Sequence, residues 1–300
     1  MTIEFVRTPD DVFENLPGFP FAPNYLKNLQ GYEGLRAHCV DEGPRNAKHT
    51  FLCLHGEPTW SYLYRKMIPV FLASGARVVA PDFFGFGRSD KPVEDAVYTF
   101  DFHRSYLKAI IEALDLTNIT LVCQDWGGIL GLTLPVEYPE LFSRMIIMNT
   151  TLPVGEDLGE GFASWKAYVA SNPNFDVVSL MKRSTPILSE AETAAYGAPF
   201  PDRQSKAGVR RFPQLVMIEP EMDGTAISQE AARFFKTRWA GECFMAVGAA
   251  DPVLGLPIMQ KLRAQIPGAS ELMVIEEGGH FLQEWGNPIA EAALDHFSKR

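Results

Sequence analysis

An aspartate stands where an apolar stretch of the chain meets a pair of glycines. The segment from Leu121 to Gly128 reads LVCQDWGG, so Asp125 and Trp126 follow a buried-strand pattern and precede a helix. A sharp strand-to-helix turn of this kind exposes one side chain, and small neighbours relieve the crowding around it. A carboxylate is ionised near neutral pH and needs no base to attack, and a helix N-terminus favours its charge. Asp125 is therefore a candidate nucleophile, with a plain helix N-cap as the alternative.

A second segment supplies donors for a developing negative charge. HGEPTW, from His55 to Trp60, follows the first long apolar strand pattern. A hydrolase with this arrangement places one backbone N–H of an oxyanion hole in that loop and the other directly after the nucleophile. We expect the amides of Glu57 and Trp126 to be these donors. His55 is interpreted as a structural histidine, because polar residues at strand exits commonly satisfy loop backbone groups.

A histidine and a second acid complete the set. His280 lies just after the last predicted strand, in the segment EEGGHF at 276–281. The Gly-Gly loop places the imidazole at the strand ends, where it can act as a general base. Asp251 follows the preceding strand in VGAADP and would fix the tautomer of His280 and stabilise the imidazolium. The order Asp125, Asp251, His280 is the nucleophile, acid, histidine order of α/β hydrolases.

The elements that must position these residues are short apolar runs alternating with longer amphipathic stretches, which predicts a largely parallel sheet. The predicted strands are 50–54, 77–80, 119–123, 145–148, 243–247 and 271–275, with an antiparallel edge hairpin within 28–42. The predicted helices are 60–72, 102–114, 128–138 and 288–298. The alternation stops between 151 and 225, which predicts a helical cap inserted between the sixth and seventh strands. The expected division is thus a core of 1–150 and 226–300 with a cap of 151–225.

The composition is that of an ordinary globular chain. The 300 residues are 46% hydrophobic and 21% charged, which argues against disordered, collagen-like and coiled-coil classes. The formal net charge of −10 disfavours nucleic acid or an anionic membrane as a partner. The N-terminus shows no signal-peptide pattern, and no apolar run reaches about 18 residues, so we expect a cytoplasmic protein. The 4 cysteines are far apart and are expected to be buried free thiols.

Together these motifs resemble those of the haloalkane dehalogenases, a family of the α/β-hydrolase fold. The resemblance extends over most of the chain and rests on 55–60, 124–128, Asp251 and 279–281. It implies an α/β fold with a mostly parallel eight-stranded sheet flanked by helices and a helical cap after strand 6. It also implies that Asp125 displaces halide from a small haloalkane and that water hydrolyses the resulting alkyl ester. No metal or organic cofactor is expected, and the products are an alcohol, a halide and a proton.

The cap segment resembles the branch of the family in which a cap tryptophan helps to hold the halide. The match is GFASWK, which contains Trp165, together with Phe212-Pro213; another branch has an asparagine where this chain has Glu57. Trp165 is thus the candidate partner of Trp126, because an indole N–H is a donor on an apolar body. Without the resemblance, Trp165 is interpreted as a packing aromatic. By position, the pocket walls are expected to be Phe162, Phe212, Pro213, Val216, Val253 and Leu254.

Other activities would need other residues. An epoxide hydrolase uses the same acid and histidine set but needs cap tyrosines as acids, and Tyr168 and Tyr196 stand in no motif that assigns this role. A fluoroacetate-type dehalogenase would need arginines close to Asp125, where the chain has Trp126 and glycines. A serine esterase is excluded at this turn because residue 125 is not serine. A ligand-binding protein of the same fold without catalysis is a further alternative.

Overall fold

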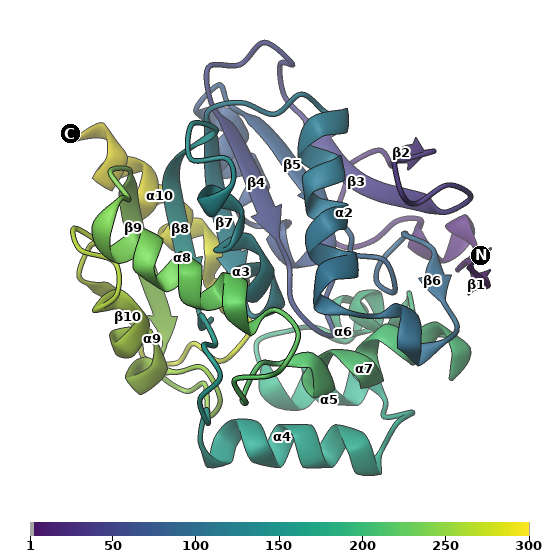
Figure 1. Ribbon diagram of the computed structural model, residues 1–300. Helices are drawn as coiled ribbons and strands as arrows, with labels where there is room; N and C mark the ends of the chain where they lie inside the picture. Colours follow the sequence, from purple (N-terminus) through teal and green to yellow (C-terminus); the bar gives the residue numbers. More distant parts are fainter. Residues whose placement is uncertain (1–2, 300) are drawn as a thin grey trace.

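A computed structural model describes residues 3–299 of the chain. Within them, eight strands form one sheet in the order β10-β9-β8-β7-β4-β5-β3-β2 (Figure 1). The parallel strands are β4 (Thr50–Leu54), β5 (Arg77–Pro81), β7 (Ile119–Gln124), β8 (Phe142–Met148), β9 (Glu242–Gly248) and β10 (Leu272–Ile275). β3 (Arg36–Glu42) runs antiparallel to both neighbours, β5 and the edge strand β2 (Asn24–Lys27). A small separate sheet pairs β1 (Phe5–Val6) with β6 (Lys91–Pro92).

The register of the central strands brings their carboxyl ends to one edge of the sheet. Leu54 at the end of β4 is level with Cys123 of β7, and Cys123 is level with Ile147 of β8. Ile147 is in turn level with Met245 of β9. β4 and β7 are buried along their whole length, as expected for apolar strands covered on both faces. Residues that follow these strands therefore gather at the edge where α/β folds bind ligands.

Helices cover both faces of the sheet. On one face α1 (Ile68–Ala73) packs against α10 (Gly286–Ser298), which also contacts β9. On the other face lie α2 (Phe100–Ala113), α3 (Trp126–Gly131) and α8 (Thr225–Thr237) (Figure 1). Helix α9 (Leu256–Arg263) packs against β9. Within residues 3–299, no helix combines the length and the apolarity needed to cross a bilayer.

The chain between β8 and α8 forms the helical insertion expected after the sixth strand. Its helices gather beyond the carboxyl ends of the strands, at the bottom of Figure 1: α4 (Glu160–Ser171), α5 (Val177–Ser184), α6 (Glu190–Gly197) and α7 (Ala207–Leu215). Two helix starts have clear local causes. The Asp176 carboxylate accepts hydrogen bonds from the first-turn amides of α5, and Ser189 forms a capping box with Glu192 in α6.

Two predicted helices are each broken in two. The predicted helix over 60–72 is a 3₁₀ turn over Ser61–Tyr64 followed by α1, which begins next to Pro69. The predicted helix over 128–138 is α3 followed by a 3₁₀ turn that contains Pro135. Proline has no N–H to donate to the preceding turn and clashes with it, so a continuous helix is interrupted at both places.

The edge hairpin is present, but its first strand lies before the stretch in which the sequence predicts it. β2 ends at Lys27, before the stretch 28–42 in which two strands were predicted. The residues between β2 and β3 form turns instead, with the Tyr32 amide donating to Leu29 and Gly31 and Gly34 at φ of +85° and +93°. Glycine adopts such positive φ values without strain, and here they reverse the chain.

Candidate active site

Asp125 lies in a strained turn between β7 and α3. Its φ of 49° and ψ of −124° are uncommon for a residue with a side chain, and such strain persists where surrounding contacts hold it. A Cβ on Gly127 would lie 1.9 Å from the Leu54 carbonyl oxygen, and one on Gly128 would lie 2.2 Å from Thr150 Oγ1. These two positions must therefore be glycine for the helix to pack this close to the sheet, with the largely buried Asp125 at its start.

The Asp125 carboxylate is held by two backbone amides. Oδ1 accepts a hydrogen bond of 2.8 Å from the Glu57 amide, and the Trp126 amide also hydrogen-bonds the carboxyl group. Beyond Trp126, the first residue of α3, the side chain makes no capping bond to the next amides of the helix, which argues against the N-cap alternative. Burial raises the pKa of Asp125, while the nearby His280 charge and the two amides act in the opposite direction. The structure thus brings both expected oxyanion donors to the candidate nucleophile.

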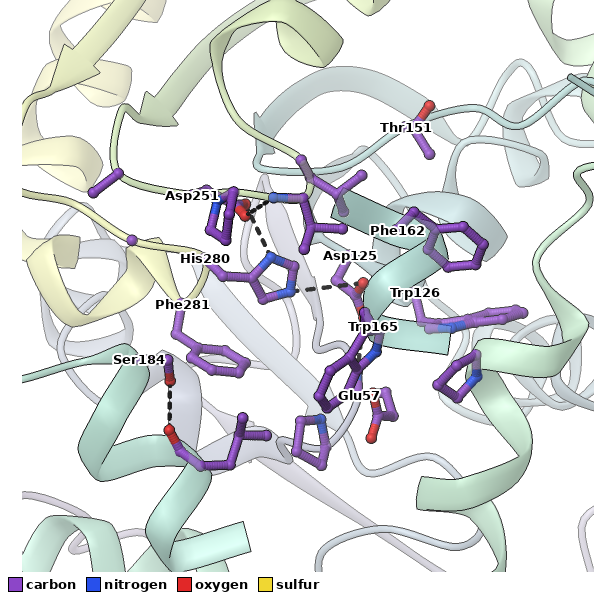
Figure 2. Close-up of a pocket in the computed structure, with 18 of the residues that line it drawn as sticks. Glu57, Asp125, Trp126, Thr151, Phe162, Trp165, Ser184, Asp251, His280 and Phe281 are labelled. Atoms are coloured by element: carbon purple, nitrogen blue, oxygen red, sulfur yellow. Dashed lines mark hydrogen bonds and ion pairs between the residues drawn. The ribbon is translucent and has the colours of Figure 1, made fainter. Parts of the chain in front are cut away.

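His280 lies between the two aspartates (Figure 2). Its Nδ1 is 2.9 Å from Oδ2 of Asp251, and its Nε2 is 3.7 Å from Oδ2 of Asp125. Burial disfavours the charged imidazole, but the carboxylates of Asp251 and Asp125 outweigh it and raise the pKa of His280 to about 9. The imidazole is therefore oriented by one carboxylate and directed at the other.

Asn149 is part of this network and was not predicted from the sequence. It follows β8, and its Nδ2 donates to Oδ2 of Asp251 at 2.7 Å while its Oδ1 accepts from the Gly248 amide at 2.9 Å. Oδ1 of Asp251 accepts from the Val253 amide at 2.8 Å. Asp251 thus has both oxygens occupied, which orients it toward His280. The signal in the sequence was a polar residue directly after a buried strand.

His55 holds the loop that carries the Glu57 amide. The buried imidazole places Nδ1 2.9 Å from the Gly56 carbonyl oxygen, and Nε2 accepts from the Phe83 amide at 3.0 Å. Burial lowers the pKa of His55 to about 4, so the ring is neutral with the proton on Nδ1. These contacts fit the structural interpretation of His55.

A cavity of about 530 Å³ opens in front of the Asp125 carboxylate. Its wall includes Asp125, Asp251 and His280 together with Trp126 and Trp165. Five of the expected pocket residues also line it: Phe162, Pro213, Val216, Val253 and Leu254. Further lining residues that were not predicted include Ile129, Thr151, Leu158, Leu180 and Pro186. Much of this wall is apolar, with a few polar side chains gathered around Asp125, as is common for pockets that bind small molecules.

The prediction that Phe212 lines the pocket is wrong. It is fully buried and is not among the described residues that line the cavity. Its ring centroid lies 4.6 Å from that of Trp126 and 4.8 Å from that of Phe86. Phe212 therefore packs behind Trp126, and Pro213, the next residue of α7, faces the cavity.

Comparison with known proteins connects this site to a family. A family model described as alpha/beta hydrolase fold matches residues 49–287. A haloalkane dehalogenase from Psychrobacter cryohalolentis is 45% identical over 287 residues, covering 94% of each chain. One from Mycobacterium marinum is 40% identical over 297 residues, covering 97% of this chain and 99% of its own. The chain belongs to the haloalkane dehalogenase family.

A solved structure of the haloalkane dehalogenase family supports this assignment. The tetrameric haloalkane dehalogenase DpaA from Paraglaciecola agarilytica NO2 superposes with a TM-score of 0.96, at 50% identity and with 98% of each chain covered.

In the present member of the family, Trp165 of α4 lines the same cavity as Trp126 and Asp125. Its ring stacks on Tyr168 with centroids 5.8 Å apart and meets Phe175 edge-on at 5.6 Å. These aromatic contacts fix the indole at the cavity wall.

Proposed function

We propose that the protein hydrolyses haloalkanes to an alcohol and a halide through an alkyl ester on Asp125. The observation that carries this proposal is the position of the Asp125 carboxylate. It faces a largely apolar cavity, with Oδ2 3.7 Å from His280 Nε2 and Oδ1 bound by the Glu57 amide. The helices within 151–225 serve as the cap over a core of 1–150 and 226–300.

In the first step Oδ2 of Asp125 attacks the carbon that carries the halogen. A new C–O bond forms as the carbon–halogen bond breaks, and the halide leaves with the bonding electrons. The step needs no base, because the carboxylate is already ionised. The indole N–H groups of Trp126 and Trp165 stabilise the departing halide, and they act strongly because the cavity is largely apolar.

In the second step water hydrolyses the ester. His280 Nε2 takes a proton from water, whose oxygen attacks the carboxyl carbon of Asp125. The amides of Glu57 and Trp126 stabilise the oxyanion, and Asp251 stabilises the imidazolium. Collapse breaks the bond between the carboxyl carbon and the ester oxygen. The alcohol leaves with an Asp125 oxygen, and the carboxylate retains the oxygen of water.

The epoxide hydrolase alternative is less well supported. Tyr196 is buried and its hydroxyl donates to Glu284, and Tyr168 is 38% exposed on α4. Neither is among the described residues that line the cavity. No cap tyrosine is therefore placed to protonate an epoxide oxygen at this site.

A panel of 1-bromoalkanes, 1-chloroalkanes and terminal epoxides tests the function. We expect equal amounts of halide and alcohol from the haloalkanes and no diol from the epoxides. Ion chromatography measures the halide, and gas chromatography measures the alcohol and the diol. Turnover of the epoxides without halide release from any haloalkane would support the epoxide alternative, and binding without any turnover would support the ligand-binding alternative.

Replacing Trp165 by phenylalanine should weaken halide binding and slow dehalogenation. Phenylalanine keeps much of the ring packing but removes the N–H. Loss of one donor to a charged group costs on the order of 1.5–3 kcal/mol, or roughly ten- to a hundredfold in bromide affinity. Quenching of tryptophan fluorescence by bromide measures the affinity. Trp239→Phe is the matched control, because its indole packs against Phe234 and Phe235 away from the cavity. Equal bromide affinity in both variants would assign Trp165 to packing.

The hydrolysis of the ester should accelerate as pH rises. His280 must be neutral to take a proton, and two carboxylates raise its pKa to about 9 in the free protein. Esterification removes the negative charge of Asp125, so only the Asp251 carboxylate still raises the pKa of His280. That pKa should therefore be lower in the ester than in the free protein. Single-turnover rapid-quench experiments from about pH 6 to 10 measure the rate of ester hydrolysis. This rate should rise with pH and level off below pH 9. A rate that is flat or falls over this range would contradict the role of His280 as base.

A further inference from the structure

The mechanism above uses the backbone amide of Glu57, but its side chain also faces the cavity. Glu57 is 4% exposed and lines the same space as Asp125, Trp126 and Trp165. Its Oε1 is buried without a hydrogen-bond partner among residues 3–299. Figure 2 shows Glu57 beside Trp165, below Asp125. A buried polar atom without a partner is costly, and here it lies in the wall of a ligand cavity.

The surroundings of Glu57 disfavour its charged form. Burial and the nearby Asp125 carboxylate raise the pKa of Glu57 well above its usual range, and a hydrogen bond from the Trp165 side chain only partly opposes them. No lysine, arginine or histidine within 3–299 forms an ion pair with Glu57. A carboxylate here would also repel a halide that leaves toward Trp165. The neutral acid, in contrast, carries one O–H donor.

We propose that Glu57 is a neutral carboxylic acid whose O–H is a third hydrogen-bond donor to the halide, beside the indoles of Trp126 and Trp165. The position next to Trp165, the buried Oε1 without a partner and the adjacent Asp125 carboxylate carry this inference. The halide accepts the hydrogen bond and no proton is transferred, so the acid is unchanged after each turnover. The inference rests on the proposed function and adds a halide ligand to it.

Two variants separate the donor from the bulk of the side chain. Glu57→Gln keeps a neutral donor of the same length, whereas Glu57→Leu removes it, and both keep the backbone amide. We expect bromide affinity, measured by tryptophan fluorescence quenching, to fall about ten- to a hundredfold in Glu57→Leu and by less than about threefold in Glu57→Gln. Glu277→Gln is the matched control, because Glu277 is an exposed acid at the same cavity and should change the affinity by less than about twofold.

The protonation state is measured directly on the unmodified chain. Infrared difference spectra at neutral pH should contain the C=O stretch of a protonated acid that shifts when bromide is added and is missing in Glu57→Gln. Bromide affinity should also fall more steeply at high pH in the unmodified protein than in Glu57→Gln. The other titratable groups that face the cavity are present in both proteins, so the difference isolates Glu57: Asp125, Arg183, Asp251, Glu277 and His280.

The possible results separate this inference from the function on which it rests. If the unmodified protein neither hydrolyses bromoalkanes nor binds bromide, the proposed function fails. If it does both, unchanged bromide affinity in Glu57→Leu overturns only the role of Glu57. Infrared spectra that show Glu57 as a carboxylate overturn that role too, and they decide the question even if Glu57→Leu does not fold.

Discussion

Replacing Asp125 by alanine should abolish the hydrolysis of 1-bromo- and 1-chloroalkanes while the fold is retained. In the proposed mechanism the carboxylate forms the covalent bond, so its loss removes the reaction path itself. We expect the rate of halide release to fall by at least about 10⁴-fold, as when the nucleophile of other covalent enzymes is removed. Halide release measures the rate, and circular dichroism with a thermal melt checks the fold.

The same variant tests the remaining interpretation of Asp125 as a structural residue. If Asp125 only capped α3, its replacement by alanine would lower the free energy of unfolding by about 1 kcal/mol. The rate of halide release would then be nearly unchanged. The structure already shows no capping bond from this side chain. Activity within about tenfold of the unmodified protein would exclude Asp125 as the nucleophile.

Replacing His280 by phenylalanine should stop the reaction halfway. In the proposed mechanism Asp125 attacks without a base, so the first step should remain. About one halide per active site should then be released. Phenylalanine accepts no proton, so the ester should not be hydrolysed and steady turnover should be lost. Rapid mixing with a bromoalkane should give a halide burst, and mass spectrometry should find the alkyl group on the peptide that contains Asp125.

A control histidine and two contrary outcomes make this test specific. His49→Phe changes a histidine just before β4, away from the cavity, and should retain steady turnover. If His280→Phe turns over steadily, His280 is not the base. If it binds the bromoalkane but neither releases halide nor gains alkyl mass, the division of the reaction between Asp125 and His280 is wrong.

The positions of Asp125, Asp251 and His280 could be predicted because each follows an apolar strand, buried in β7 and β9 and partly exposed in β10. Near-continuous apolar runs mark such strands, and their carboxyl ends meet at one edge of the sheet. Asn149 also follows a buried strand, but its contact with Asp251 depends on β9 lying next to β8. That order of strands results from tertiary packing and has no local signal, so this residue was missed.

The cap was predictable in outline only. The loss of strand rhythm after β8 predicted helices, but the side of α7 that faces the cavity depends on how the cap packs on the core. Phe212 was therefore assigned to the cavity wall, although it packs behind Trp126. The side chain of Glu57 is a similar case, because its burial and its contact with Trp165 exist only once the cap covers the loop.

The central claim is that the oxygen of water enters the Asp125 carboxyl group before it can appear in the alcohol. A single turnover in water enriched in oxygen-18, with enzyme in excess over a bromoalkane, tests this most directly. The two-step scheme predicts an alcohol with ordinary oxygen and one heavy oxygen in the peptide that contains Asp125, located by mass spectrometry. Heavy oxygen in the alcohol of that first turnover, with an unlabelled Asp125 peptide, would mean that water attacks the substrate carbon directly and would contradict the covalent ester.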